Sequence, residues 1–187
     1  NTASLWLRIE AGSAFLIEPR SASARSERSC IDEFTDLLHV EIDSDAARLT
    51  TAGTGIYEHA AILVAAALTG LAEAARDQAA AYACERVQFG KPIGTFQAIK
   101  HACADMAVRA EACWSQTGYA ALALRDGLSD AHFQVSAAKV LAGEGASSNA
   151  AANLQVHGGY GFTTEYDAHL FIKRAHVLNS LAGSPRV

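Results

Sequence analysis

The sequence predicts a mainly α-helical protein, an up-down four-helix bundle preceded by a few β-strands from an incomplete β domain. Three observations support this fold class. Residues 1–52 contain short runs in which apolar and polar residues alternate, as in half-buried strands. After Gly55 the composition changes to alanine and leucine at helical spacing, and glycine or proline then interrupts the pattern at only a few points. We therefore place a β segment at residues 1–52 and a helical domain at 53–187.

The β segment begins with two alternating runs, at residues 5–9 and 15–17, separated by the turn-forming residues 11–13. This pattern predicts a hairpin. Leu38, Val40 and Ile42 alternate in the same way and predict a third strand. Residues 19–33 are polar and have neither period, so we expect a loop there. Three short strands cannot bury both faces of a sheet, so we expect the rest of a β domain upstream or on another chain.

The first helix is expected from Gly55 to the turn at residues 89–92, where glycine and proline end it. One of its faces is predicted to contain Ile62, Ala66, Gly70, Leu71, Ala74 and Gln78. The alanines and glycine on this face would let another helix approach closely. A second helix is expected from about Phe96 to Arg125, after which Gly127 closes it.

The third helix is expected to begin at Ser129, whose hydroxyl can cap free backbone amides, and to reach about Val156. A capping box at residues 164–167 predicts the start of the fourth helix, and Gly183 ends it. Short connections between long helices imply antiparallel neighbours, and hence an up-down bundle.

Composition excludes several function classes. The 187 residues are 50% hydrophobic with a net charge of -5, and no basic stripe interleaved with aromatic residues suggests a nucleic-acid partner. The four cysteines have no disulfide or zinc-ligand spacing, so we expect no metal site and mostly reduced, buried thiols. No run reaches about 20 apolar residues, which argues against a membrane span. We expect a cytoplasmic protein from which an amino-terminal portion is missing.

Two runs carry the functional signal: ERVQFGKPIGTFQ at residues 85–97 and QVHGGYGF at residues 155–162. A guanidinium at the end of a helix, as at Arg86, suits a pyrophosphate, although most arginines are surface residues without a ligand. Adjacent glycines let a backbone approach an anionic or flat ligand, although glycines between helices are usually caps. Neither run is decisive alone.

Together, in this order and at this separation, the two runs resemble the carboxy-terminal half of the acyl-CoA dehydrogenases, with the likeness extending over residues 53–182. The resemblance implies that residues 1–52 are a remnant of the family's middle β domain and 53–187 its C-terminal helical bundle. It also implies FAD as cofactor, held mainly by a neighbouring subunit. The residues implied to contact that flavin dinucleotide are Arg86, Gln88, Phe89 and Gln97 from the first run, and Gln155, Gly158 and Gly159 from the second.

The family's catalytic base is a glutamate that removes the α proton of an acyl-CoA while hydride leaves the β carbon. Most members place it just after the fourth bundle helix, which corresponds to Ala182, and a subgroup places it on the first bundle helix, which corresponds to Ala60. The catalytic residue is therefore unknown. Glu58 is the nearest acid, but two residues correspond to about 200° around a helix, and an acid in a first helical turn also suits the helix dipole.

Three interpretations follow from the resemblance. The chain is a subunit or fragment of an FAD-dependent enzyme that oxidises the α,β bond of a CoA thioester, with electron-transfer flavoprotein as acceptor. Alternatively, it is a non-catalytic, flavin-facing assembly subunit of a heteromeric dehydrogenase, or, if the match of the flavin-facing residues is a coincidence, a flavin-free helical scaffold. The first two imply a homo- or hetero-oligomer, dimeric or tetrameric, with related subunits. The acyl group is not determined by the sequence.

Overall fold

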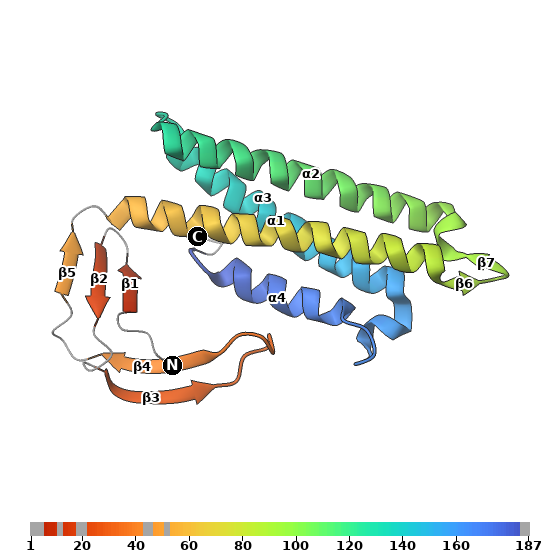
Figure 1. Ribbon diagram of the computed structural model, residues 1–187, viewed down its shortest axis with the longest axis horizontal. Helices are drawn as coiled ribbons and strands as arrows, with labels where there is room; N and C mark the ends of the chain where they lie inside the picture. Colours follow the sequence, from red (N-terminus) through yellow and green to blue (C-terminus); the bar gives the residue numbers. More distant parts are fainter. Residues whose placement is uncertain (1–5, 11–12, 18–21, 43–46, 51–52, 184–187) are drawn as a thin grey trace. The chain divides into compact units, whose positions relative to one another are not determined.

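The computed structural model describes residues 6–10, 13–17, 22–42, 47–50 and 53–183. The chain divides into two compact units, residues 1–60 and 61–187. The first contains short antiparallel strands and the beginning of a long helix, and the second contains the remainder of that helix and three others. Figure 1 shows the strands of the first unit and the helices of the second.

The predicted hairpin is confirmed. Strand β1 (Trp6–Glu10) pairs antiparallel with β2 (Ser13–Ile17), with Glu10 opposite Ser13, and the residues between them, 11–12, lie outside the description. Strand β5 (Ala47–Thr50) pairs with the other edge of β2, so this sheet has the order β1-β2-β5.

The loop predicted at residues 19–33 is wrong in part, because β3 (Ala22–Arg28) lies within it and pairs antiparallel with β4 (Leu37–Ile42). Strand β4 itself was predicted. The sequence of β3 is alanine, serine and charged residues, so it has no apolar alternation to reveal it, and its pairing depends on backbone groups of β4. Between these strands the Asp32 carboxylate accepts hydrogen bonds from the backbone of Phe34 and the hydroxyl of Thr35.

The predicted four-helix bundle is confirmed. Its helices are α1 (Gly53–Glu85), α2 (Gln97–Asp126), α3 (Ala131–His157) and α4 (Ala168–Ser180). Successive helices run in opposite directions, so α1 and α3 are parallel to each other (Figure 1). Gly127, with φ of 65°, closes α2 in the left-handed conformation, as its position after Asp126 predicted.

Two helix starts differ from the prediction. Asp130, not Ser129, is the N-cap of α3, and its carboxylate accepts a hydrogen bond from the Gln134 side chain rather than from the helix backbone. The fourth helix begins at Ala168 rather than at Thr164. The residues before it form turns in which the Tyr166 ring packs edge-on against Tyr82 of α1. That contact competes with an earlier helix start.

The core of the bundle is built mainly from alanine. The buried hydrophobic residues of α1 recur every three or four positions, at Ala61, Ala65, Leu68, Ala72, Ala75, Ala79 and Ala83. This is not the predicted face, since Ala66, Gly70 and Ala74 are exposed. Alanine occurs on nearly every side of α1, so its hydrophobic periodicity is ambiguous.

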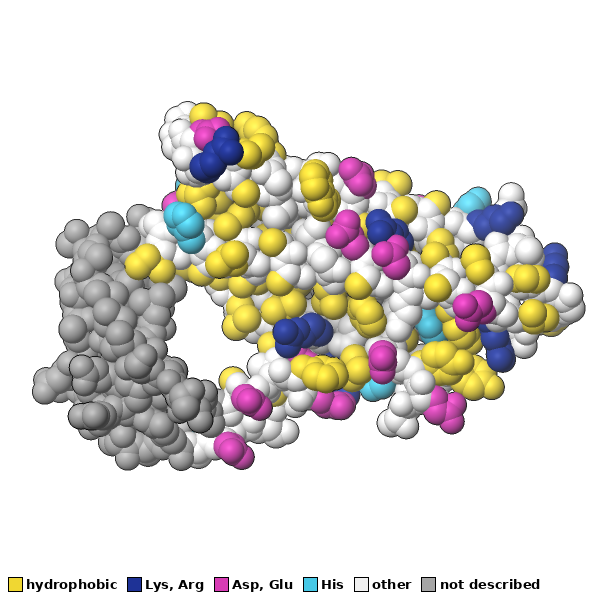
Figure 2. Space-filling view, in the orientation of Figure 1, with side chains coloured by type: hydrophobic (Ala, Val, Ile, Leu, Met, Phe, Trp, Pro, Cys, Tyr) yellow, Lys and Arg dark blue, Asp and Glu magenta, His cyan; other side chains and the backbone are white. Residues whose placement is uncertain are grey.

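Several bulky or reactive side chains lie at the surface. Trp114 and Phe133 are exposed, and of the four cysteines Cys113 is buried whereas Cys84 is exposed, so the expectation of mostly buried thiols is wrong. On the face shown in Figure 2, hydrophobic side chains are interspersed with acidic and basic ones across the helices. Helices whose buried side chains are mainly alanine pack closely, and they leave little room in the core for such large side chains.

One described helix segment, Gly55–Glu85, is long and apolar enough to cross a membrane by length and composition, with a mean hydropathy of 1.4 in its most apolar window. A core helix of a bundle meets the same criterion, and α1 supplies much of the bundle core. The sequence-based expectation of no membrane span therefore remains a prediction.

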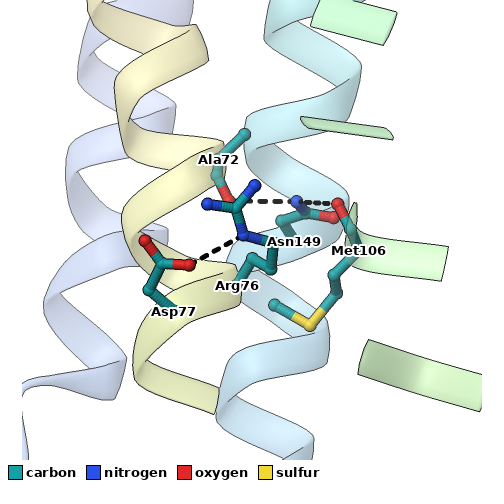
Figure 3. A network of polar contacts seen from close by, with 5 residues as sticks. All are labelled: Ala72, Arg76, Asp77, Met106 and Asn149. Atoms are coloured by element: carbon teal, nitrogen blue, oxygen red, sulfur yellow. Dashed lines mark hydrogen bonds and ion pairs between the residues drawn. The ribbon is translucent and has the colours of Figure 1, made fainter. Parts of the chain in front are cut away.

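Two hydrogen bonds and a stacked pair of rings connect α1 and α3 along the bundle. The Asn149 side-chain amide, fully buried, donates to the Ala72 carbonyl of α1 at 3.0 Å and to the Met106 carbonyl of α2 at 2.9 Å, so it ties three helices together (Figure 3). The same figure shows the Arg76–Asp77 ion pair nearby on α1, at 2.8 Å. These bonds fix the axial register of α1 and α3.

One helical turn further along, the Asn153 side chain donates to the Gln78 side chain at 2.6 Å. After another turn the His157 imidazole stacks on the Tyr82 ring, with centroids 4.0 Å apart. Because α1 and α3 are parallel, these three contacts follow each other in the same order on both helices. The register set in the core therefore positions the ends of both helices, where the two functional runs begin.

Candidate functional site

The first functional run folds as a tight hairpin at the end of α1. Strand β6 (Val87–Gln88) pairs with β7 (Lys91–Pro92), and the two residues between them, Phe89 and Gly90, have φ of 54° and 78°. Positive φ at both central positions is the signature of a type I′ turn, which favours Asn-Gly. A phenylalanine there is strained, and its side chain is 92% exposed. Strain combined with exposure indicates a functional constraint.

The hairpin is held firmly against the bundle. The backbone N–H of Ile93 donates to the Arg86 carbonyl at 2.8 Å, and the Ile93 side chain is buried. Gly94 packs so closely on α1 that an added Cβ would lie 2.9 Å from the Ala83 carbonyl oxygen. The turn is therefore fixed in position, and so is the Arg86 side chain at its base.

The second functional run ends α3. Gly158 has φ of 60° and ψ of −140°, a conformation that is essentially restricted to glycine. A short 3₁₀ helix, η3 (Gly158–Phe162), follows. A Cβ added at Gly158 or Gly159 would meet no atom within 4 Å, so the backbone of this turn is open to a ligand.

The two runs meet to line a pocket of about 580 Å³. Its walls come from the end of α1, the hairpin, the start of α2 and the end of α3. The lining residues are Tyr82, Arg86, Gln88, Phe89, Ile93, Phe96, Ile99, Val156, His157, Gly158, Gly159, Tyr160 and Thr163. Most of these side chains are apolar or aromatic, and the buried cluster beneath them includes Ile93 and Val156.

The pocket contains five of the seven residues that the resemblance implied for a flavin dinucleotide: Arg86, Gln88, Phe89, Gly158 and Gly159. Gln97 and Gln155 do not line it, and both are exposed. Gln155 precedes the pocket residue Val156 by one position and so faces a different side of α3. A role for these two glutamines in cofactor binding stays a prediction.

Sequence reasoning missed the aromatic wall of the pocket. Tyr82 lies one helical turn before Arg86, and Tyr160 lies inside the second run, so spacing from the two runs could have found both. The Arg86 guanidinium lies over the Tyr160 ring, 4.7 Å from its centroid. Burial raises the pKa of the Tyr82 phenol above its ordinary value.

The chemistry of the pocket fits an anionic, partly aromatic ligand such as a dinucleotide. Arg86 supplies a positive charge with planar N–H donors, and within the described part of the chain no carboxylate pairs with it. Aromatic side chains, among them Tyr82 and Tyr160, line the pocket, and the turn at Gly158 and Gly159 supplies open backbone. These residues would hold the pyrophosphate and a ring system of a flavin dinucleotide.

The two positions to which the resemblance assigns a catalytic base carry no carboxylate. Ala60 lies on α1, and Glu58, two residues before it, is half-buried. Ala182 follows α4 in the left-handed conformation, with φ of 52°, and Gly183 continues with φ of 97°. The alanine at each position is thus part of ordered backbone and has no acid or base function.

A buried lysine holds the segment that contains Ala182. The Lys139 ammonium donates to the Asn179 carbonyl at 3.0 Å and to the Gly183 carbonyl at 3.3 Å, and it lies 3.4 Å from the Asn179 side-chain oxygen. Three donors meet three oxygens, which stabilises the end of α4. Burial lowers the pKa of Lys139.

Comparison with known proteins gives one consistent result. The family model described as "Acyl-CoA dehydrogenase, C-terminal domain" matches residues 46–187. The acyl-CoA dehydrogenases FadE34 and IpdE2 of Mycobacterium tuberculosis are 44% identical over 138 residues and 41% identical over 140 residues, covering 72% and 71% of this chain.

A solved structure, the glutaryl-coenzyme A dehydrogenase glutaryl-CoA complex, superposes on the whole chain with a TM-score of 0.84 and 30% identity. The chain spans only 19% of FadE34, 40% of IpdE2 and 53% of that solved chain. The matches therefore cover a part of each of these proteins.

Proposed function

Because the chain belongs to the acyl-CoA dehydrogenase family, we propose that it is part of an FAD-dependent enzyme that oxidises the α,β bond of a CoA thioester. The observation that carries this proposal is the pocket in which Arg86, Phe89 and the Gly158–Gly159 turn come together from two distant runs. When bound, the flavin would supply the hydride acceptor for the substrate.

This chain's residues would bind and orient that cofactor. The Arg86 guanidinium would neutralise the pyrophosphate, and the open backbone at Gly158 and Gly159 would let it approach closely. Phe89, held outward by its strained turn, would cover an apolar part of the ligand and exclude water from it. The strain is retained because the hairpin around Phe89 is anchored on both sides.

Several further properties belong to the same proposal. The pocket is open rather than enclosed by this chain, which supports a cofactor shared with a neighbouring subunit, and hence a homo- or hetero-oligomer, dimeric or tetrameric. The substrate would be an acyl-CoA, and an electron-transfer flavoprotein would accept the electrons. We propose a cytoplasmic location, in keeping with the four free cysteines.

The proposal is tested by flavin retention in the full-length protein, assembled with any related subunit. Arg86→Ala should lower FAD affinity at least tenfold, about the loss expected for one charge-assisted contact to a phosphate. Arg125→Ala is the matched control, since Arg125 is an exposed arginine at a helix end that pairs with Asp126. Equal FAD affinity in both variants, with unchanged helix content, would contradict the assignment.

A second candidate function, a non-catalytic flavin-facing assembly subunit, is favoured by the alanines at both base positions, Ala60 and Ala182. The two candidates separate when the full-length protein is assayed with and without a related subunit that carries the missing glutamate. Turnover without such a subunit supports a base in this protein, and Glu58→Gln then tests whether Glu58 is that base. Turnover that requires the second subunit supports the assembly function.

A further inference from the structure

His157 is the last residue of α3 and lines the pocket, although its side chain is only 4% exposed. Its Nδ1 lies 2.9 Å from the Asn153 carbonyl oxygen. A carbonyl oxygen can only accept a hydrogen bond, so Nδ1 carries the hydrogen. In the neutral imidazole the other nitrogen, Nε2, is therefore an acceptor with a free lone pair.

The ring orientation is fixed by its neighbours. Tyr82 stacks on one face of the imidazole with an interplanar angle of 22°, and Tyr166 meets it edge-on at 5.7 Å. Asn153 and Gln78 bond to each other one turn earlier and hold the backbone that receives the Nδ1 hydrogen bond. The direction of Nε2 is thus set by α1 and α3 before any ligand binds.

Within the described residues Nε2 has no hydrogen-bond partner. The Asn153 side-chain oxygen is the only fully buried side-chain nitrogen or oxygen of those residues that lacks one. Nε2, which also lacks one, is therefore not sealed in the core but reaches the surface at the pocket. Because this acceptor lies at the pocket and has no partner among the described residues, a ligand donor that reaches it gains affinity.

We propose that Nε2 of His157 accepts a hydrogen bond from a hydroxyl or exocyclic amine of a nucleoside in the pocket. This inference rests on the proposed function and assigns the nucleoside to the adenosine end of FAD. With the imidazole neutral, a phosphate is excluded as the partner of Nε2, because phosphate oxygens accept at neutral pH and would face another acceptor. The phosphates are left to Arg86, and His157 distinguishes the nucleoside.

The first arm of the test uses full-length apoprotein in its natural assembly, reconstituted with FAD and followed by flavin fluorescence. His157→Phe keeps an aromatic ring on Tyr82 and removes Nε2, so FAD affinity should fall about tenfold. His169→Phe is the matched control, because His169 also bonds through Nδ1 to a backbone carbonyl, of Tyr166 at 3.0 Å, but does not line the pocket. It should bind FAD as the unmodified protein does.

The second arm needs no variant. Flavin dinucleotides that carry inosine, 2′-deoxyadenosine or 3′-deoxyadenosine each lack one candidate donor. The unmodified protein should bind one of them about tenfold more weakly than FAD, and His157→Phe should bind that analogue and FAD equally. The analogue that is rejected identifies the donor.

The outcomes separate the inference from the function on which it rests. If the unmodified protein binds all three analogues as well as FAD, or if folded His157→Phe keeps full FAD affinity, the inference is overturned and the proposed function stands. If the unmodified assembly binds no FAD, both are overturned. If His157→Phe does not fold, discrimination among the analogues by the unmodified protein decides the question alone.

Discussion

The guanidinium of Arg86 lies 4.7 Å from the centre of the Tyr160 ring, so a residue that follows α1 is in contact with one that follows α3. The two residues are far apart in the sequence, and the contact joins the two functional runs directly. One face of the guanidinium lies against the Tyr160 ring. The N–H groups at the edge of the guanidinium therefore remain available to a ligand. The pocket is therefore preorganised for an anion.

The glycine pair of the second run should have two separable roles. Gly158→Ala forces a side chain into a glycine-only conformation and should lower the free energy of unfolding by about 1–3 kcal/mol. Gly159→Ala has neither positive φ nor a neighbouring atom to clash with, so stability should change by less than about 0.5 kcal/mol. Its added methyl group should nevertheless weaken FAD binding. Urea unfolding and flavin titration of both variants measure this contrast, and a Gly159→Ala protein with full FAD affinity would remove Gly159 from the ligand site.

Phe89 should lower the stability of the fold and strengthen flavin binding. Glycine adopts φ of 54° without the left-handed penalty, so Phe89→Gly should stabilise the full-length protein by roughly 1 kcal/mol. The same substitution removes the exposed ring and should weaken flavin binding. Thermal unfolding without flavin, compared with flavin affinity, checks both effects. A variant that is less stable than the parent would show that the ring supports the fold rather than the site.

Lys139 should give a characteristic pH dependence of stability. Burial lowers the pKa of Lys139 in the folded protein, so between the folded and unfolded pKa values the unfolded chain binds more protons. The free energy of unfolding contributed by this group must therefore rise with pH across that alkaline window, and the burial cost is complete below it. The Lys139→Met variant has no titratable ammonium at this position and should therefore lack this pH dependence.

The stability of the parent relative to Lys139→Met should accordingly increase from neutral to alkaline pH in paired urea titrations. A difference that stays constant or shrinks over that range would contradict the assigned burial effect. The same variant should also loosen the end of α4, because the carbonyls of Asn179 and Gly183 lose their shared donor.

The bundle was predictable because the residues that end its helices act through local backbone geometry. Gly127 and the Phe89–Pro92 turn end helices through backbone geometry that glycine and proline reveal in the sequence. The buried face of α1 was not predictable, because alanines at Ala65 and Ala66 differ in burial although they are the same residue. The polar strand β3 was missed because its pairing depends on backbone groups of β4, which no side-chain pattern reports.

The lining of the pocket was predictable where the motif itself supplies it, as at Arg86 and Gly159. Spacing from Arg86 could have drawn attention to Tyr82, but its stacking on His157 could be recognised only once α1 was known to end beside α3. The tautomer of His157 depends on a hydrogen bond to Asn153 and on burial, neither of which is visible in a single sequence. Tertiary packing, rather than local preference, determines these features.

We propose that this pocket holds part of a flavin dinucleotide in an acyl-CoA dehydrogenase. The most direct test is the visible absorption spectrum of the full-length protein, purified together with any related subunit, before and after addition of a panel of acyl-CoA thioesters. We predict a bound-flavin spectrum that is bleached by at least one thioester. A folded, correctly assembled complex without flavin would contradict the claim and favour a flavin-free helical scaffold.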